Sequence, residues 1–174
     1  ALSLPTHYGI TNISETPKEI FLIQLKKQLE QGLKIIQIRE KNLSIKEFKK
    51  ITLEIIAICR PYSAKVIVNS SIELANNVNA NGVHLNSIEL KKLAKKPKKL
   101  IVGASCHSEE DIQIAQDKKL DFVVFSPVNK TISHPKIMPL GWTKFSSITN
   151  KFGIPIYALG GMKKSDIKKA LNAG

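Results

Sequence analysis

Short apolar runs that are rich in β-branched residues recur along all 174 residues of this chain, with helix-like segments between them. These runs predict seven strands, at 8–11, 35–39, 66–69, 82–85, 101–105, 122–126 and 155–159. The spacing leaves room for one strand, one helix and two short loops in each repeat. Because the runs are apolar almost throughout, they are typical of parallel strands that are covered on both faces.

The segments between the predicted strands carry signals for helix starts and helix ends. A Ser or Thr with Glu three residues later predicts a capping box, and this pattern begins at Thr16, Ser44 and Ser70. Ser108 precedes an acidic first turn, which suits the positive end of a helix dipole. We expect helices to end near three glycines, Gly32, Gly82 and Gly174.

Seven such repeats are typical of a barrel or of an open doubly wound sheet. We predict an α/β fold of the (β/α)8 TIM barrel type with parallel strands, forming one domain over residues 1–174. A complete barrel needs eight strands, and the next strand of the pattern would begin where this chain stops. The eighth strand is therefore predicted to be missing from this chain, through truncation at the C-terminus.

Composition narrows the classes of function. No apolar run approaches the roughly 18 residues of a membrane-spanning helix. No secretory leader opens the chain, and the two cysteines fit a reducing compartment. We therefore expect a cytoplasmic protein without a membrane partner. The net charge of +13 is densest at 91–99. We interpret that cluster as a solvated helix face, because no aromatic residue is interleaved for base stacking, and we keep nucleic-acid binding as the lesser alternative.

Polar residues follow several predicted strands. Gln37, Arg39 and Lys41 share one face of the second strand, while the intervening isoleucines occupy the other. Burying such cations without a partner is costly, so we expect an anionic ligand there; a structural ion pair is the alternative. Other strand ends add donors that suit a phosphate, namely Asn69, Ser105, Thr131, Ser133, His134, Gly160 and Gly161.

The histidines and cysteines are interpreted one by one, because no spacing typical of a zinc site is present. His84 lies within a predicted strand and is interpreted as a satisfied interior histidine. His107 is expected to cap the fifth strand, and His134 is the histidine best placed for a ligand. We interpret Cys106 as a buried structural thiol rather than a nucleophile.

Five segments resemble the thiamine phosphate synthase/TenI-like family, in family order. They are Tyr8-Gly9-Ile10-Thr11, Gln37-Ile38-Arg39-Glu40-Lys41, Asn81-Gly82-Val83-His84-Leu85, Gly103-Ala104-Ser105-Cys106-His107-Ser108 and Ala158-Leu159-Gly160-Gly161-Met162. The stretch 131–142 looks like a sub-branch fused behind a Nudix hydrolase domain, which would lie upstream. A homodimer is a further expectation.

The resemblance implies a transferase that joins an aminopyrimidine methyl diphosphate to a thiazole phosphate, giving thiamine phosphate. It implies that Gln37, Arg39, Lys41 and Asn69 hold the diphosphate, and that Ser105 supports the pyrimidine cation or the pyrophosphate. Thr131, Ser133 and His134 would bind on the thiazole phosphate side, and Gly160 with Gly161 would complete the phosphate nest.

Several positions depart from the family pattern. Ser70 stands where the synthases carry a magnesium-binding Asp, Glu89 stands near a second metal Asp, and His134 replaces a Lys. We therefore expect Mg²⁺ binding to be weakened, with Glu89 as a weak ligand. Pro127 occupies the place of the tautomerase histidine. The alternative to a synthase is a non-catalytic or altered-specificity module that binds phosphorylated metabolites.

Overall fold

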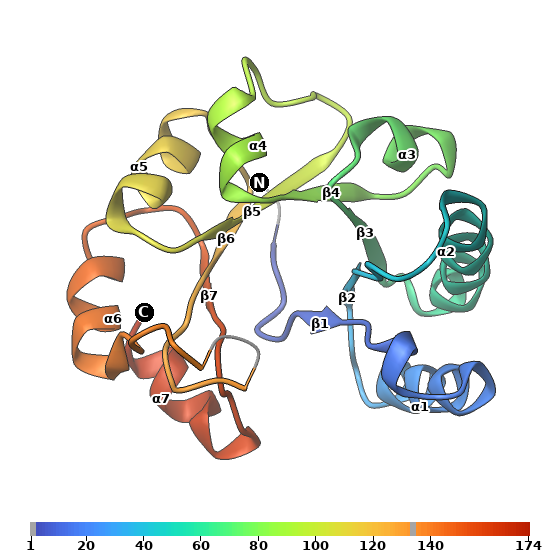
Figure 1. Ribbon diagram of the computed structural model, residues 1–174, viewed down its shortest axis with the longest axis horizontal. Helices are drawn as coiled ribbons and strands as arrows, with labels where there is room; N and C mark the ends of the chain where they lie inside the picture. The colour runs from blue at the N-terminus through green and yellow to red at the C-terminus, as the bar shows by residue number, and fades with distance from the viewer. Residues whose placement is uncertain (1–2, 133–134) are drawn as a thin grey trace. The chain divides into compact units, whose positions relative to one another are not determined.

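The computed structural model describes residues 3–132 and 135–174 (Figure 1). The chain forms two compact units. The first consists of Ala1–His84 and Lys99–Ile101, and the second of Leu85–Lys98 and Val102–Gly174. The expectation of a single domain over 1–174 stays a prediction, and the two units are described in turn.

The first unit contains the first four βα repeats. Its elements are β1 (Gly9–Ile10), η1 (Ile13–Glu15), α1 (Lys18–Glu30), β2 (Ile35–Ile38), α2 (Ile45–Cys59), η2 (Arg60–Tyr62), β3 (Lys65–Asn69), α3 (Ile72–Asn77) and β4 (Gly82–Leu85), the last residue of which belongs to the second unit. The strands pair in parallel and in sequence order. In the register, Ile36 stands opposite Val66, and Ile67 opposite Gly82.

The second unit repeats the same plan. Its elements are α4 (Ser87–Lys92), β5 (Ile101–Cys106), α5 (Glu109–Asp117), β6 (Phe122–Phe125), α6 (Gly141–Thr149), β7 (Ile156–Ala158), η3 (Lys164–Asp166) and α7 (Ile167–Asn172). Ile101, the first residue of β5, belongs to the first unit. The strands β5, β6 and β7 are again parallel and in sequence order, with Ser105 opposite Val124 and Val124 opposite Tyr157.

All seven predicted strands are present, and the expectation of parallel strands alternating with helices is confirmed. No eighth strand occurs within 3–132 and 135–174. None of the helices in these ranges is long and apolar enough to cross a membrane.

Each unit has an apolar core made by strands and the inner stripes of helices. In α1 the buried residues Phe21, Leu25 and Leu29 recur every four positions, so one face of the helix is apolar. All four residues of β2 are buried, as expected for a strand covered on both sides. In the second unit, Phe122 and Phe125 of β6 are fully buried.

Two of the predicted helix starts are confirmed. Ser44 accepts a hydrogen bond from the Glu47 amide at 3.2 Å, and the Glu47 carboxylate accepts one from the Ser44 amide at 2.9 Å, which completes the capping box. Ser108 caps α5 by accepting from the Asp111 amide at 3.1 Å.

Two predicted capping boxes are wrong. Helix α1 begins at Lys18 with Pro17 as its N-cap, and no side chain caps it, so Thr16 does not act as expected. Helix α3 is capped by Ser71, whose hydroxyl accepts from the Leu74 amide at 3.0 Å. Ser70 instead turns the chain after β3, with a positive φ of 74° and its amide bonded to the His84 carbonyl.

Of the three glycines that we expect near helix ends, two are confirmed and one is wrong. Gly32 and Gly174 follow helix ends with positive φ angles of 106° and 93°, as predicted. Gly82 does not end a helix; it is the first residue of β4. A Cβ at this position would collide with the carbonyl of Ile101, so close packing between strands explains this glycine.

Candidate functional site

Polar side chains cluster at the carboxyl ends of β2 and β3 in the first unit. Gln37 of β2 is 2% exposed, and its Oε1 accepts a hydrogen bond from the Asn69 side-chain amide at 2.8 Å. The structure therefore brings together Gln37 and Asn69, two residues that the sequence analysis assigns to the same diphosphate. The hydrogen bond between their side chains orients both amide groups.

Arg39 and Lys41 are exposed, so the expectation that they would be buried cations is wrong. The reason is that β2 ends at Ile38 and the chain then leaves the buried layer. The Arg39 amide nevertheless donates to the Thr11 hydroxyl at 3.0 Å, which fixes the backbone from which the guanidinium extends. Exposure removes the argument that burial demands an anion, but it leaves these cations accessible to one.

Glu40, between these two cations, has a structural role that the sequence analysis missed. Its side chain is 8% exposed and accepts hydrogen bonds from the amides of Ile13 and Ser14. The carboxylate thereby ties the turn η1 to the end of β2. Glu40 lies 27 positions after Ile13 and 26 positions after Ser14, and no local sequence signal indicates contacts over such separations.

His84 lies on β4 of the same unit and is 2% exposed. The Tyr8 hydroxyl lies 3.0 Å from His84 Nδ1, and the two rings stack with their centroids 5.8 Å apart. Burial, followed by the positive charge of Arg39, lowers the pKa of His84 from 6.5 to about 3. The interpretation of an interior histidine is confirmed, and the ring is neutral at physiological pH.

In the second unit, β5 carries Ser105 between buried neighbours. Ser105 is partly exposed, whereas Cys106 is fully buried. Burial, and to a lesser extent the nearby charge of Asp111, raises the pKa of the Cys106 thiol to about 12. A buried thiol with a raised pKa cannot serve as a nucleophile, so the interpretation of Cys106 as structural is confirmed.

Gly160 and Gly161 pack against the loop that follows β6. The Val128 amide donates to the Leu159 carbonyl at 2.9 Å, and the Asn129 amide donates to the Gly160 carbonyl at 3.0 Å. Gly160 has a φ of 107°, and a Cβ there would lie 2.6 Å from Pro127 Cα. The structure thus gives these glycines a packing role beside the phosphate role that the sequence predicted.

The loop after β6 also carries three of the predicted ligand residues. Thr131 is partly exposed and lies just beyond the segment that Gly160 and Gly161 contact. Ser133 and His134 lie outside the residues that the structure describes.

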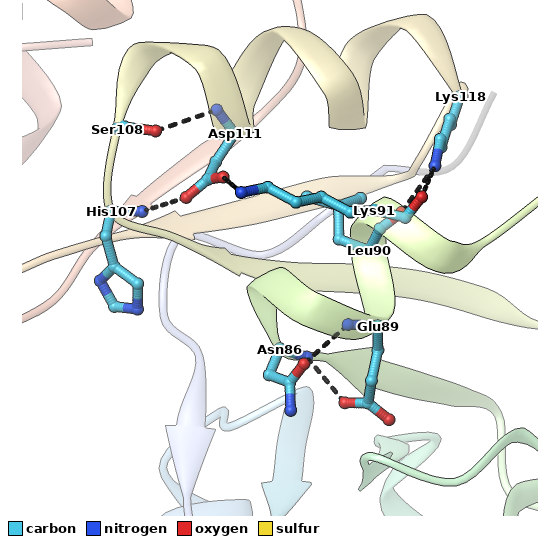
Figure 2. A network of polar contacts seen from close by, with 8 residues as sticks. All are labelled: Asn86, Glu89, Leu90, Lys91, His107, Ser108, Asp111 and Lys118. Atoms are coloured by element: carbon cyan, nitrogen blue, oxygen red, sulfur yellow. Dashed lines mark hydrogen bonds and ion pairs between the residues drawn. The ribbon is translucent and has the colours of Figure 1, made fainter.

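Glu89, the weak candidate for a metal ligand, closes a capping box at the start of α4 (Figure 2). Its carboxylate accepts from the Asn86 amide at 3.0 Å, and Asn86 Oδ1 accepts from the Glu89 amide at 2.8 Å. Within 3–132 and 135–174, no group of three or more His, Cys, Asp or Glu side chains could hold a metal ion. Ser70 offers a hydroxyl in place of a carboxylate, and the weakened binding of Mg²⁺ stays a prediction.

The sequence predicts that the lysine-rich segment 91–99 forms one solvated helix face. This expectation is wrong. Helix α4 ends at Lys92, and its last carbonyls, those of Leu90 and Lys91, accept hydrogen bonds from the Lys118 ammonium at 2.7 and 2.9 Å (Figure 2). Lys96 pairs with Asp121 at 2.8 Å. Part of the positive charge is therefore used within the fold.

The parallel βα repeats, with polar side chains following the strands, define a protein of the (β/α)-barrel class. Residues 7–174 match the family model TMP-TENI, described as thiamine monophosphate synthase, and the chain belongs to this family.

Individual relatives agree with this assignment. The chain is 35% identical to "Putative thiamine-phosphate synthase 2" of Aquifex aeolicus, across 99% of this chain and 94% of that protein. It is 34% identical to a thiamine-phosphate synthase of Prochlorococcus marinus, across 96% of this chain but only 47% of that longer protein. A solved structure, thiamine phosphate pyrophosphorylase from Pyrococcus furiosus, matches with a TM-score of 0.79 and 28% identity, covering 96% of this chain and 80% of that one. The predicted fold class, with seven strands of the barrel pattern in this chain, is thereby confirmed.

Proposed function

We propose that this protein joins an aminopyrimidine methyl diphosphate to a thiazole phosphate and releases pyrophosphate. The names of its relatives support this reaction. Within the chain itself, the observation that carries the proposal is the arrangement around Arg39. An accessible guanidinium extends from a backbone that the Thr11 hydroxyl holds, two positions after Gln37, whose side chain is bonded to that of Asn69.

The proposed chemistry needs binding and orientation more than it needs a nucleophile. The C–O bond to the diphosphate breaks, its electron pair leaves with pyrophosphate, and the thiazole nitrogen then forms a C–N bond to the pyrimidine carbon. Fixed cations and dipoles stabilise the charges that develop. In this proposal Gln37, Arg39, Lys41 and Asn69 hold the diphosphate, and Ser105 supports the pyrimidine cation or the departing pyrophosphate.

The second phosphate needs its own site. We assign it to Thr131, Ser133 and His134 in the loop after β6, with Gly160 and Gly161 holding that loop in place. The contacts from Val128 and Asn129 to the segment 159–160 support this part of the assignment, because they fix the loop just before Thr131.

We propose that Mg²⁺ assists this protein only weakly. When bound, the ion would neutralise charge on the diphosphate. The donor set described above supplies few carboxylates for it, and Glu89 already caps α4. We therefore expect most of the negative charge to be met by side-chain cations.

The test uses inorganic pyrophosphate as the probe, with calorimetry of the intact protein. We expect Arg39→Ala to weaken pyrophosphate binding by about tenfold or more, because one charge-assisted contact to a phosphoryl group is lost. Arg60→Ala is the matched control, since Arg60 is exposed and precedes β3, whereas Arg39 follows a strand end. Equal affinity in wild type and Arg39→Ala would contradict the proposal.

A second candidate function is a module that binds phosphorylated metabolites without converting them; the substitution of Ser70 for a carboxylate favours it. Turnover measured with both substrates and Mg²⁺ separates the two functions, because a binding module releases no pyrophosphate. A homodimer, an upstream Nudix domain and a cytoplasmic location stay predictions.

A further inference from the structure

His107 is held in a defined orientation at the end of β5, although the proposed reaction gives it no role. It follows Cys106, the last residue of β5, and lies two positions after Ser105. The residue is exposed, and its Nδ1 lies 3.3 Å from the Ser126 carbonyl oxygen and 3.4 Å from the Ser126 hydroxyl.

The backbone of His107 is fixed as well as its ring. The His107 amide donates to the Asp111 carboxylate at 3.0 Å, and Asp111 is only 5% exposed. In Figure 2 the imidazole points away from Asp111 and from α5. The buried carboxylate therefore positions the residue, while the ring is turned to the other side.

These contacts occupy one nitrogen of the ring, Nδ1, to which Ser126 offers both a carbonyl oxygen and a hydroxyl. When the ring is charged, both nitrogens donate hydrogen bonds, so Nδ1 can donate to Ser126 while Nε2 donates to another partner.

Three carboxylates on the neighbouring helices have partners of their own. Asp111 of α5 faces Lys91 of α4 at 3.9 Å, and Glu109 of α5 pairs with Lys151 at 3.1 Å. Glu89 of α4 closes the capping box described above. The remaining acidic residue in the first turn of α5, Glu110, is exposed.

We propose that His107 binds a phosphoryl oxygen of the ligand, by donating a charge-assisted hydrogen bond from Nε2. This inference rests on the proposed function, and it assigns to the second unit a cationic contact to phosphate of its own. An imidazolium suits a site with few metal-binding carboxylates, because it supplies positive charge without a metal ion.

The experiment is an NMR titration of the imidazole signals in the intact protein, with and without inorganic pyrophosphate. The chain has four histidines, so single substitutions assign the signals. We expect bound pyrophosphate to shift the imidazole signals of His107, since a phosphoryl oxygen then lies against the ring. His7, which is exposed and bonded to Thr6, is the control whose signals should not move.

Calorimetry supplies the second readout. His107→Gln should weaken pyrophosphate binding about tenfold, because one charge-assisted contact is lost, whereas His107→Lys should retain binding. Ring replacement leaves the amide contact to Asp111 intact, and circular dichroism of each variant verifies that it folds.

The outcomes separate this inference from the proposed function. If Arg39→Ala weakens pyrophosphate binding while His107→Gln does not, or if bound pyrophosphate leaves the imidazole signals of His107 unmoved, the role of His107 is overturned alone. If the wild-type protein binds no pyrophosphate, both proposals are overturned together.

Discussion

At the scale of single residues, the buried His84 makes the stability of the protein depend on pH. Its pKa is about 3 in the folded chain and 6.5 as an ordinary value, so the unfolded state takes up the proton first as pH falls. Stability is therefore complete above pH 6.5 and decreases between pH 6.5 and pH 3. From pH 7 to pH 5 this one group should lower the free energy of unfolding by about 2 kcal/mol.

Urea denaturation at these two pH values checks the prediction, with His84→Gln as the comparison. The variant should lose about 2 kcal/mol less than wild type over the same interval, whatever its stability at pH 7. Equal losses in both proteins would mean that His84 is not the titrating group.

Two glycines with nearly the same φ separate backbone strain from steric collision. Gly32 has a φ of 106° and no atom within 4 Å of the place that a Cβ would occupy, whereas Gly160 has a φ of 107° and Pro127 Cα at 2.6 Å from that place. Gly32→Ala should cost about 1 kcal/mol, from the left-handed backbone alone. Gly160→Ala should cost at least about 2 kcal/mol more, because the loop after β6 must shift. Urea denaturation of both variants measures the difference; equal costs would contradict the close approach.

At the scale of elements, helix starts are where the sequence patterns agree least with the fold. Ser44 caps α2 through two reciprocal bonds, whereas Thr16, in a similar pattern, makes no capping bond to α1. Ser44→Ala should therefore lower the free energy of unfolding by about 1 kcal/mol, and Thr16→Ala by only a few tenths. Thermal or urea denaturation of the pair is the measurement. A comparable loss in both variants would show that Thr16 caps α1 after all.

At the scale of the whole molecule, the net charge of +13 invites an interpretation of nucleic-acid binding. Lys92, Lys95, Lys98 and Lys99 are exposed, and the segment after Lys92 is not helical. We expect the variant with all four changed to Glu to keep its pyrophosphate affinity within about twofold, because the proposed ligand contacts lie at strand ends. Binding of a labelled DNA strand should be the same in this variant and in the wild type. A DNA affinity that falls steeply with added salt and is lost in the variant would favour the nucleic-acid alternative.

The fold was predictable because each strand is marked by its own apolar run. A strand that is buried on both faces is an almost continuous run of apolar residues, and such a run can be recognised from the sequence alone. Strands β2 and β6 are examples. The start of α3 was placed one residue early because Ser70 and Ser71 are both plausible caps, and only the turn after β3 decides between them.

The candidate site was predictable only in part. Gln37 and Asn69 were expected at neighbouring strand ends, and they do meet. The exposure of Arg39 and the contacts of Glu40 could not be foreseen, because they depend on where β2 ends and on a turn far away in the sequence. Sequence reasoning gave His107 only a capping role, because its fixed orientation comes from Ser126 and Asp111 together.

The two native thiols, Cys59 and Cys106, are both buried, and burial raises the pKa of Cys59 to about 11. Maleimide reagents attack thiolates, so the folded protein should be nearly inert to them. A cysteine introduced on an exposed position such as Lys46 would then be the single reactive handle. The molecule thus accepts a site-specific fluorophore without prior removal of its own sulfhydryl groups.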